Sequence, residues 1–226
     1  KKDTLNFDEI FTKSSNVGSI QIIEKIGIEK QKELFQKISL GKKINLHGLK
    51  VVNNKLPTNW DTVASKSISY GYGISISPIS LISSYAPLVN GGYKINPKIN
   101  FNKNIKREKV LSKETSKKIN TLLKKVVGLG TGNKAKVNGI EVGGKTGTSK
   151  KLDKNDYSDK KLITSFIGAF PINDPRYLTL VLFDEPKRNT TESLESFGGN
   201  TAAPTFSRIV SKITPILDRN NYLKIK

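Results

Sequence analysis

The sequence predicts an α+β fold, in which several helices precede a meander of antiparallel strands and a last helix follows. Three observations lead to this prediction. Apolar residues recur at helical spacing through much of the first half of the 226 residues. Two apolar segments, 162–170 and 177–183, are separated by a proline-bounded turn and have the pattern of a β-hairpin. Helices and strands that are separated along the chain, instead of alternating, favour an antiparallel sheet flanked by helices.

The first 61 residues predict three short helices and an irregular segment. Asn6 and Glu9 have the spacing of a capping box, which marks the start of a short helix. A second helix is predicted over 17–26, where three isoleucines fall on one side and a glycine follows: Ile20, Ile23, Ile26 and Gly27. A third helix covers 31–38, and residues 42–61 then form an irregular segment anchored by Trp60.

Longer elements are predicted after residue 77. A helix begins at Pro78, since proline fits the first helical turn, and its expected buried face comprises Leu81, Ile82, Tyr85, Leu88 and Val89. Residues 93–110 form a short hairpin or an extended connection. A strongly amphipathic helix covers 114–127, and a charged loop is predicted over 150–161. The last helix is expected to bury one face, which consists of Phe206, Ile209, Val210 and Ile213.

The segment 142–149 has the character of a strand but contains three glycines. Several glycines in a strand indicate that another backbone or a ligand comes close. Lys145, Thr146 and Thr148 add an ammonium group and two hydroxyls beside this bare backbone. Such a strand can bind an extended peptide as an added strand and hold its terminal carboxylate. The alternative for this segment taken alone is a glycine-rich hairpin edge without a ligand.

Composition limits the chemistry that the chain can perform. Because the chain has no cysteine, disulfides, thiolate catalysis and cysteine-based zinc sites are excluded. His47 is the single histidine and has no acidic neighbour in the sequence, so that it is a poor base for a Ser-His-Asp triad. Acyl transfer would therefore have to use a lysine as its base, which desolvation permits. We expect neither a metal nor a cofactor.

The net charge of +20 is compatible with a basic nucleic-acid-binding module. However, only five of the 39 cationic residues are arginines, although arginine is the preferred reader of bases and phosphates. The cations are also spread along the whole chain. We therefore expect no nucleic-acid partner and interpret the charge as solvated surface that helps to attract an anionic polymer.

Five short motifs occur in a fixed order and cover nearly the whole chain: Ser14-Ser15-Asn16, Tyr70-Gly71-Tyr72-Gly73 before Ser77-Pro78, Asn90-Gly91-Gly92, Gly144-Lys145-Thr146-Gly147-Thr148, and 199–206. In this order they resemble the transpeptidase domain of class B penicillin-binding proteins, and the division-specific (septal) branch in particular. The resemblance implies the penicillin-binding/β-lactamase-like fold, incomplete here at the N-terminus. It assigns residues 1–218 to the C-terminal portion of that domain and residues 219–226 to a tail.

The resemblance implies catalytic roles for three residues. Ser14 and Asn16 match the family's S-x-N element, in which the serine relays protons and the asparagine binds substrate and orients the catalytic lysine. Lys145 matches the lysine of the K-T-G element, which shares the network of Ser14 and makes the pocket electropositive. These roles require the hydroxyl of Ser14 and the ammonium of Lys145 to face each other across one cleft.

The resemblance also implies a substrate-binding strand. Thr146, Gly147 and Thr148 match the element whose hydroxyls hold the carboxylate of a D-Ala-D-Ala stem peptide or of a β-lactam. The backbone N–H of Thr148 would be one half of the oxyanion hole, where a single donor is typically worth about 3–4 kcal/mol of barrier.

One part of the family pattern is missing. The nucleophile and general base lie in an S-x-x-K element before S-x-N, and we expect that element upstream of this chain. Two S-x-x-K matches within the chain, at 39–42 and 158–161, come after Ser14 and are interpreted as chance matches. The 226 residues alone should therefore be inactive.

The resemblance leaves alternatives open. A β-lactamase or a penicillin-sensing receptor domain on the same fold carries similar motifs and differs from a transpeptidase in its deacylation rate. A transpeptidase of the septal type would be anchored in the inner membrane by a single segment, with its catalytic domain in the periplasm. Its partners would be a lipid-II-polymerising glycosyltransferase and other proteins of the division machinery.

Overall fold

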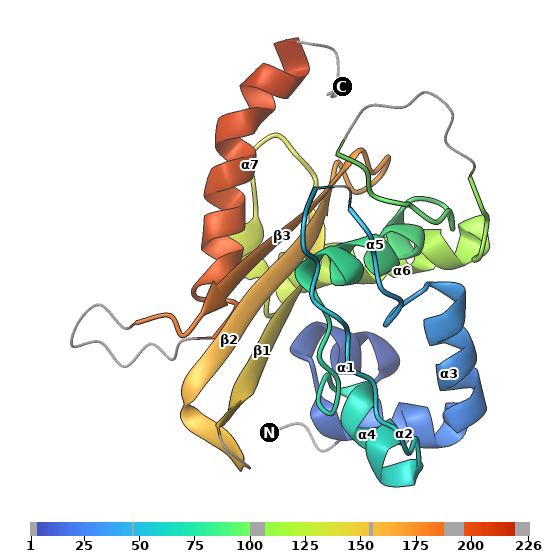
Figure 1. The fold of residues 1–226 in the computed structure, drawn as a ribbon. Coiled ribbons are helices and arrows are strands. Elements are labelled where there is room, and N and C mark those ends of the chain that lie inside the picture. Colours follow the sequence, from blue (N-terminus) through green and yellow to red (C-terminus); the bar gives the residue numbers. More distant parts are fainter. Residues whose placement is uncertain (1–3, 47, 100–106, 154–155, 188–196, 220–226) are drawn as a thin grey trace. The chain divides into compact units, whose positions relative to one another are not determined.

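The computed structural model describes residues 4–46, 48–99, 107–153, 156–187 and 197–219 (Figure 1). It consists of two compact units, Lys1–Ile119 and Asn120–Lys226, and each is described by itself. His47 and residues 220–226, which include nearly all of the expected tail, lie outside the described residues. No helix within the described part of the chain has the length and apolar character needed to cross a membrane.

The N-terminal unit is helical, as the sequence predicts. Its elements are α1 (Phe7–Lys13), α2 (Asn16–Ile26), α3 (Ile28–Lys37), α4 (Thr62–Ser69), α5 (Pro78–Val89) and the first part of α6 (Lys113–Leu129). The predicted capping box is confirmed, because the side chain of Asn6 accepts the Glu9 N–H and the Glu9 carboxylate accepts the Asn6 N–H, both at 2.9 Å. Within α2, Ile23 is buried as predicted, whereas Ile26 in the last turn is 44% exposed.

Helix α4 is an element that the sequence analysis missed. Asp61 caps it by accepting the Ala64 N–H at 2.8 Å, and α4 packs against α2 and α3. The buried amide of Gln31 joins α3 to this region. Its oxygen accepts from the indole N–H of Trp60 at 2.9 Å and from the hydroxyl of Ser65 at 2.7 Å. Trp60 is thus the anchor of the preceding irregular segment, as predicted.

Helix α5 begins at Pro78 as predicted, and its predicted buried face is confirmed only in part, since Val89 is buried and the other four residues are half-buried. Of the five residues named for that face, only Val89 is fully buried; the other buried residues are Ser80, Ser84, Ala86 and Pro87. A small polar side chain suits position 80 because the neighbouring loop presents polar groups to it. The amide of Asn54 donates to the Ser80 hydroxyl at 3.0 Å, and that hydroxyl also reaches the Lys42 carbonyl at 3.4 Å.

The two ends of the connection between α5 and α6 pair as in a hairpin. Of the two predicted alternatives, a short hairpin or an extended connection, this pairing agrees with the hairpin. Tyr93 and Lys109 form an antiparallel bridge, and the Val110 N–H donates to the Gly92 carbonyl at 2.8 Å. Residues 100–106 lie outside the described residues.

The C-terminal unit contains the rest of α6, the short 3-10 helix η1 (Asn133–Ala135), three strands and α7 (Ala202–Arg219). Strands β1 (Gly143–Asp153), β2 (Asp156–Phe170) and β3 (Tyr177–Asp184) form an antiparallel sheet in the order β1-β2-β3 within the described residues. The register pairs Lys145 with Ile167 and Phe166 with Val181. The predicted antiparallel sheet and the predicted hairpin of β2 and β3 are confirmed.

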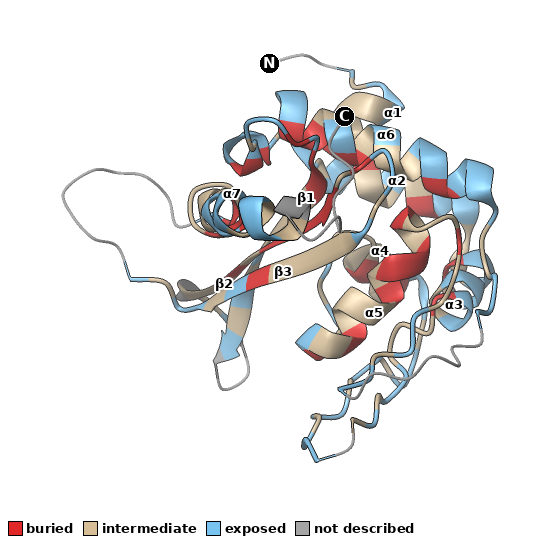
Figure 2. Ribbon diagram, turned by 90° about the horizontal axis from the view of Figure 1, so that it is seen from above, coloured by how far each residue is buried: buried red, intermediate tan, exposed pale blue. Residues whose placement is uncertain are grey.

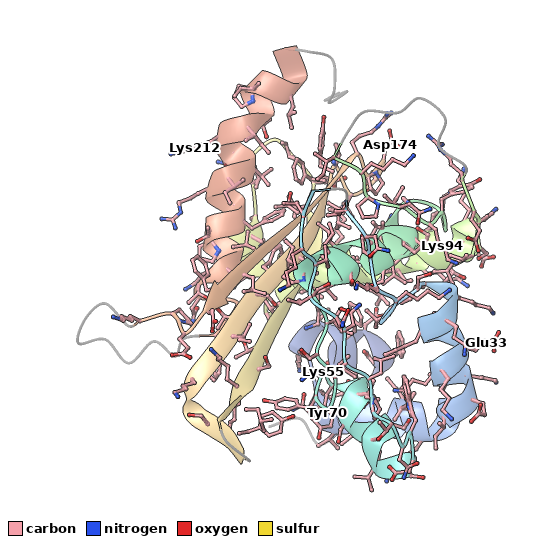
Figure 3. All side chains as sticks on the ribbon, in the orientation of Figure 1. Glu33, Lys55, Tyr70, Lys94, Asp174 and Lys212 are labelled. Carbon is pink, nitrogen blue, oxygen red and sulfur yellow. The ribbon has the colours of Figure 1, made fainter. Side chains whose placement is uncertain are left out.

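Helix α7 covers β2 and β3 and forms the core of this unit with them. Phe166, Phe170 and Phe206 are fully buried, and the ring centroids of Phe166 and Phe206 are 4.9 Å apart. In Figure 2 the buried residues of the sheet and of α7 appear in red. Ile209, which was predicted to belong to the buried face, is 38% exposed, and Lys212 lies on the exposed side of α7 (Figure 3).

The charged loop predicted over 150–161 is wrong for most of its length. β1 continues to Asp153 and β2 begins at Asp156, with an irregularity in the register between Lys150 and Leu152. The ammonium of Lys151 bonds to the carboxylates of Asp184 at 2.9 Å and Glu185 at 2.7 Å. Charged residues are poor strand formers by propensity, but the pairing of β1 with β2 and the ion pairs to the end of β3 outweigh that preference here. The second chance S-x-x-K match thus lies in β2.

Candidate active site

The middle of β1 contains glycines that let its backbone lie close to residues of the neighbouring strand β2. A Cβ at Gly144 would clash with the Phe166 ring and lie 2.6 Å from the Ile167 carbonyl oxygen. A Cβ at Gly147 would lie 2.5 Å from the Ser165 hydroxyl oxygen. Only glycine therefore fits at position 144, whereas at position 147 a larger residue would have to displace the Ser165 hydroxyl. The close approach is to the neighbouring strand β2.

Lys145 is half-buried on this strand. Its ammonium donates to the Thr146 carbonyl at 3.2 Å. Burial disfavours the charged form and lowers the pKa of Lys145 from the ordinary 10.5 to about 8. A lysine with a pKa in this range can exchange a proton near neutral pH, as proton-transfer chemistry requires.

The two threonine hydroxyls of β1 are each held by a different segment of the same unit. The Thr148 hydroxyl accepts the Gly198 N–H at 2.9 Å. The hydroxyl oxygens of Thr146 and Thr131 are 2.7 Å apart, and either can donate. Thr148 is exposed and Thr146 is half-buried, so that both hydroxyls can be reached from outside. The strand thus presents one ammonium and two hydroxyls, which are groups suited to a carboxylate.

Sequence reasoning missed Thr131 and Gly198 as partners of these hydroxyls. The only signal for them was the glycine-flanked position of Thr131 in Gly130-Thr131-Gly132 and the doublet Gly198-Gly199. A Cβ at Gly198 would lie 2.5 Å from the carbonyl oxygens of Gly147 and Ser165. This close approach allows the backbone of 197–199 to reach β1.

Ser14 and Asn16 lie at the junction of α1 and α2 in the N-terminal unit, as predicted. Ser14 is the C-cap of α1 and has a left-handed backbone conformation with φ of 56°. Ser15 is the N-cap of α2, and its side chain accepts the Gly18 N–H at 3.1 Å. Asn16 is the first residue of α2, and both Ser14 and Asn16 are exposed. The N-cap of α2 is therefore Ser15. Helix capping does not account for the presence of a serine at position 14 or an asparagine at position 16.

The junction holds its shape through a close contact between its helices. A Cβ at Gly18 would lie 2.6 Å from the side chain of Ile10 on α1, so that α2 can approach α1 only with glycine at this position. Apart from Gly147, which has no side chain, the predicted site has five residues, and these are divided between the two units. Ser14 and Asn16 belong to the first unit, and Lys145, Thr146 and Thr148 belong to the second.

Comparison with known families agrees with the motif order. The model of the penicillin binding protein transpeptidase domain matches residues 1–211. The chain belongs to this family. The predicted resemblance and fold class are therefore confirmed, whereas the boundary proposed at residue 218 stays a prediction.

Related proteins place the transpeptidase domain among proteins of cell-wall synthesis. The protein named "Probable peptidoglycan D,D-transpeptidase FtsI" from Caulobacter vibrioides is 34% identical over 232 residues, which cover 96% of this chain and 39% of that protein. The chain spans about two fifths of the length of the curated relatives that it matches.

Two solved structures share the fold. The apo transpeptidase domain of penicillin-binding protein 3 from Burkholderia pseudomallei has a TM-score of 0.83 and 30% identity, and the match covers 94% of this chain and 65% of that one. Penicillin-binding protein 3 from Mycobacterium tuberculosis, complexed with aztreonam, has a TM-score of 0.81 and 25% identity over 96% and 52% of the two chains.

Proposed function

We propose that this chain supplies the substrate-binding strand and part of the catalytic residues of a peptidoglycan D,D-transpeptidase. The observation that carries the proposal is the composition of β1, where a lysine with a pKa of about 8 stands beside two accessible threonine hydroxyls on a strand that belongs to a transpeptidase domain. The substrate would be a peptidoglycan stem peptide that ends in D-Ala-D-Ala. The peptide would bind along β1, with its carboxylate against Thr146 and Thr148.

The proposed reaction has two acyl-transfer steps. A serine hydroxyl attacks the carbonyl of the penultimate D-Ala, its proton passes to the leaving amine, and D-Ala departs. The amine of a second stem peptide then attacks the acyl-enzyme carbonyl, the ester bond to the serine breaks, and the proton lost by the amine returns to the serine oxygen. In this scheme the Thr148 N–H stabilises the oxyanion, and Ser14 and Lys145 move protons while Asn16 orients substrate and the general-base lysine.

The nucleophile and general base belong, in this proposal, to an S-x-x-K segment outside the 226 residues. The relatives that match this chain are longer than it is, which is compatible with a further segment. We further propose that the protein acts in septal cell-wall synthesis, with an inner-membrane anchor and a periplasmic catalytic domain. A lipid-II-polymerising glycosyltransferase and other division proteins would be its partners.

Binding of β-lactams follows from the same chemistry, because a β-lactam offers a strained acyl group next to a carboxylate. The solved relative complexed with aztreonam supports this part of the proposal. The direct test is to label the complete protein that contains this chain with a fluorescent penicillin. We expect one covalent adduct that unlabelled benzylpenicillin prevents; a folded protein without an adduct would refute the proposed function.

The same experiment separates a transpeptidase from a β-lactamase on this fold. After removal of free penicillin, a transpeptidase keeps its adduct for many minutes, whereas a β-lactamase releases the drug rapidly. We expect slow release. An adduct that disappears as quickly as it forms would favour the β-lactamase alternative.

A further inference from the structure

A pair of accessible hydroxyls lies at the centre of the candidate substrate strand. The Thr131 and Thr146 hydroxyl oxygens are 2.7 Å apart, which is the usual length of a hydroxyl–hydroxyl hydrogen bond. Thr146 is on β1, and Thr131 is on the short loop between α6 and η1. The second residue is thus brought to the first by an element that is separate in the sequence.

The loop that carries Thr131 is fixed to the core on both sides of this residue. The N–H groups of Gly130 and Gly132 both donate to the Val126 carbonyl, at 3.0 and 3.2 Å. Gly132 is buried, and a Cβ there would lie 3.1 Å from the Phe166 ring. Because its neighbours are held in this way, Thr131 has a defined position beside β1.

A second segment closes on Thr131 from another direction. A Cβ at Gly199 would lie 2.6 Å from the Thr131 carbonyl oxygen, so that the turn before α7 lies directly against this residue. The adjoining Gly198 N–H donates to the Thr148 hydroxyl at 2.9 Å. Thr131 therefore lies between β1 and the turn that holds the other threonine hydroxyl.

These contacts decide how the two hydroxyl protons can be used. A hydroxyl has one proton and two acceptor positions. The Thr148 oxygen accepts from Gly198, and this bond does not use the Thr148 proton, which can donate to a ligand. For Thr146 to donate to the same anion, its bond to Thr131 must run in one direction only, with Thr131 donating and Thr146 accepting. Hydrogen bonds arranged in such a chain strengthen one another.

We propose that Thr131 is a positioning residue that directs the Thr146 hydroxyl toward the substrate or β-lactam carboxylate. This inference rests on the proposed function, since it assigns to Thr131 a task at the same carboxylate-binding strand. Thr131 acts through Thr146 and does not itself touch the ligand. Its removal should therefore weaken reactions of ligands that have a free carboxylate and leave other ligands unaffected.

The test uses the complete protein that contains this chain and measures the second-order rate constant of acylation. The ligands are benzylpenicillin and its methyl ester, which lacks the anionic carboxylate. For Thr131→Val we expect the rate constant with the acid to fall about 2- to 10-fold, the range that one neutral hydrogen bond contributes. The rate constant with the ester should be unchanged. Thr131→Ser, which keeps the hydroxyl, should restore most of the rate with the acid.

Two controls separate positioning from a structural role. Thr115→Val removes the same atoms from another exposed hydroxyl pair, in which Thr115 and Ser112 are 2.8 Å apart in the N-terminal unit, and should change neither rate. In the background Thr146→Val, the further change Thr131→Val should have no effect on the acid, because both act through one hydroxyl. If Thr131→Val does not fold, Thr131→Ala is used with the same expectations.

Each outcome leads to a different conclusion. A loss confined to the acid and restored by serine supports the inference. Equal rates for wild type and Thr131→Val, or equal losses with acid and ester, overturn the inference while the proposed function stands. Wild-type protein that reacts with neither ligand overturns the proposed function and the inference together.

Discussion

Replacing Lys145 by methionine is predicted to stabilise the fold near neutral pH, although it removes the cation on which the proposed chemistry depends. Burial lowers the pKa of Lys145 from the ordinary 10.5 to about 8, which means that the folded state disfavours the charged ammonium. Methionine has a similar length and no charge, and it avoids this penalty.

The sign and magnitude follow from proton linkage. Below pH 8 the lysine is charged in both states, and the folded state bears the full penalty. Between pH 8 and 10.5 the unfolded chain binds more protons than the folded one, so that the stability of the wild type rises with pH in this window. The difference between the two pKa values corresponds to about 3 kcal/mol at about 1.36 kcal/mol per pH unit. Since Lys145 is only half-buried and keeps a hydrogen bond to the Thr146 carbonyl, we expect about 1–3 kcal/mol.

The assay is urea unfolding followed by circular dichroism at pH 7 and pH 10, with the free energy of unfolding compared between wild type and Lys145→Met. The advantage of the variant should be present at pH 7 and should shrink at pH 10. Lys212→Met, which changes an exposed lysine on α7, serves as the control and should alter the free energy little at either pH. The reasoning is refuted if Lys145→Met is less stable than wild type at pH 7, or if its advantage is the same at both pH values.

Three further changes test the two units, two of them packing in the C-terminal unit and one a buried hydrogen bond in the N-terminal unit. Gly144→Ala should destabilise the chain by at least about 1–3 kcal/mol, because the added methyl group meets the Phe166 ring. Gly128→Ala in α6, where nothing lies within 4 Å of an added Cβ, should stabilise it by about 0.5–1 kcal/mol; urea unfolding measures both, and equal effects would contradict the packing argument. Gln31→Leu should cost about 1–3 kcal/mol, because it removes the acceptor for the indole N–H of Trp60. The fluorescence of Trp60, the only tryptophan, reports this unfolding, and an unchanged midpoint would show that the bond contributes nothing.

The sequence predicted those elements whose local signals agree with their packing. The capping box at Asn6, the proline at the start of α5 and the apolar hairpin of β2 and β3 are examples, since residue type alone favours each conformation. Helix α4 was not predicted because it is short and lacks a clear apolar face. Val63, near its start, is 73% exposed and does not belong to the buried side. The position of α4 depends on contacts with α2 and α3, which no local pattern contains.

Elements stabilised by partners distant in the sequence could not be predicted. The outer parts of β1 and β2 are rich in charged residues, and Lys151 gains its two carboxylate partners only when β3 lies nearby. Ser80 of α5 is buried at a position where the side chain of Asn54, from the preceding loop, donates a hydrogen bond to its hydroxyl. Apolar periodicity describes helices that face an apolar neighbour, and it fails where the neighbour is polar.

For the candidate site, the strand was predictable and the residues that orient it were not. Lys145, Thr146 and Thr148 stand out because glycines surround them in one short segment. Thr131 is 15 residues away from Thr146 and resembles an ordinary loop residue in the sequence. Only the fold places its hydroxyl against that of Thr146.

The proposed function requires Ser14 and Lys145 to act in one cleft, and cross-linking tests this requirement most directly. The 226 residues contain no cysteine. A double variant with Ser14→Cys and Lys145→Cys therefore has a single pair of thiols within them. A short bifunctional thiol reagent should join this pair within one molecule, while the single variants Ser14→Cys and Lys145→Cys, which have one thiol each, should show no such link. The account is contradicted if the double variant also stays unlinked although a monofunctional reagent modifies both of its thiols.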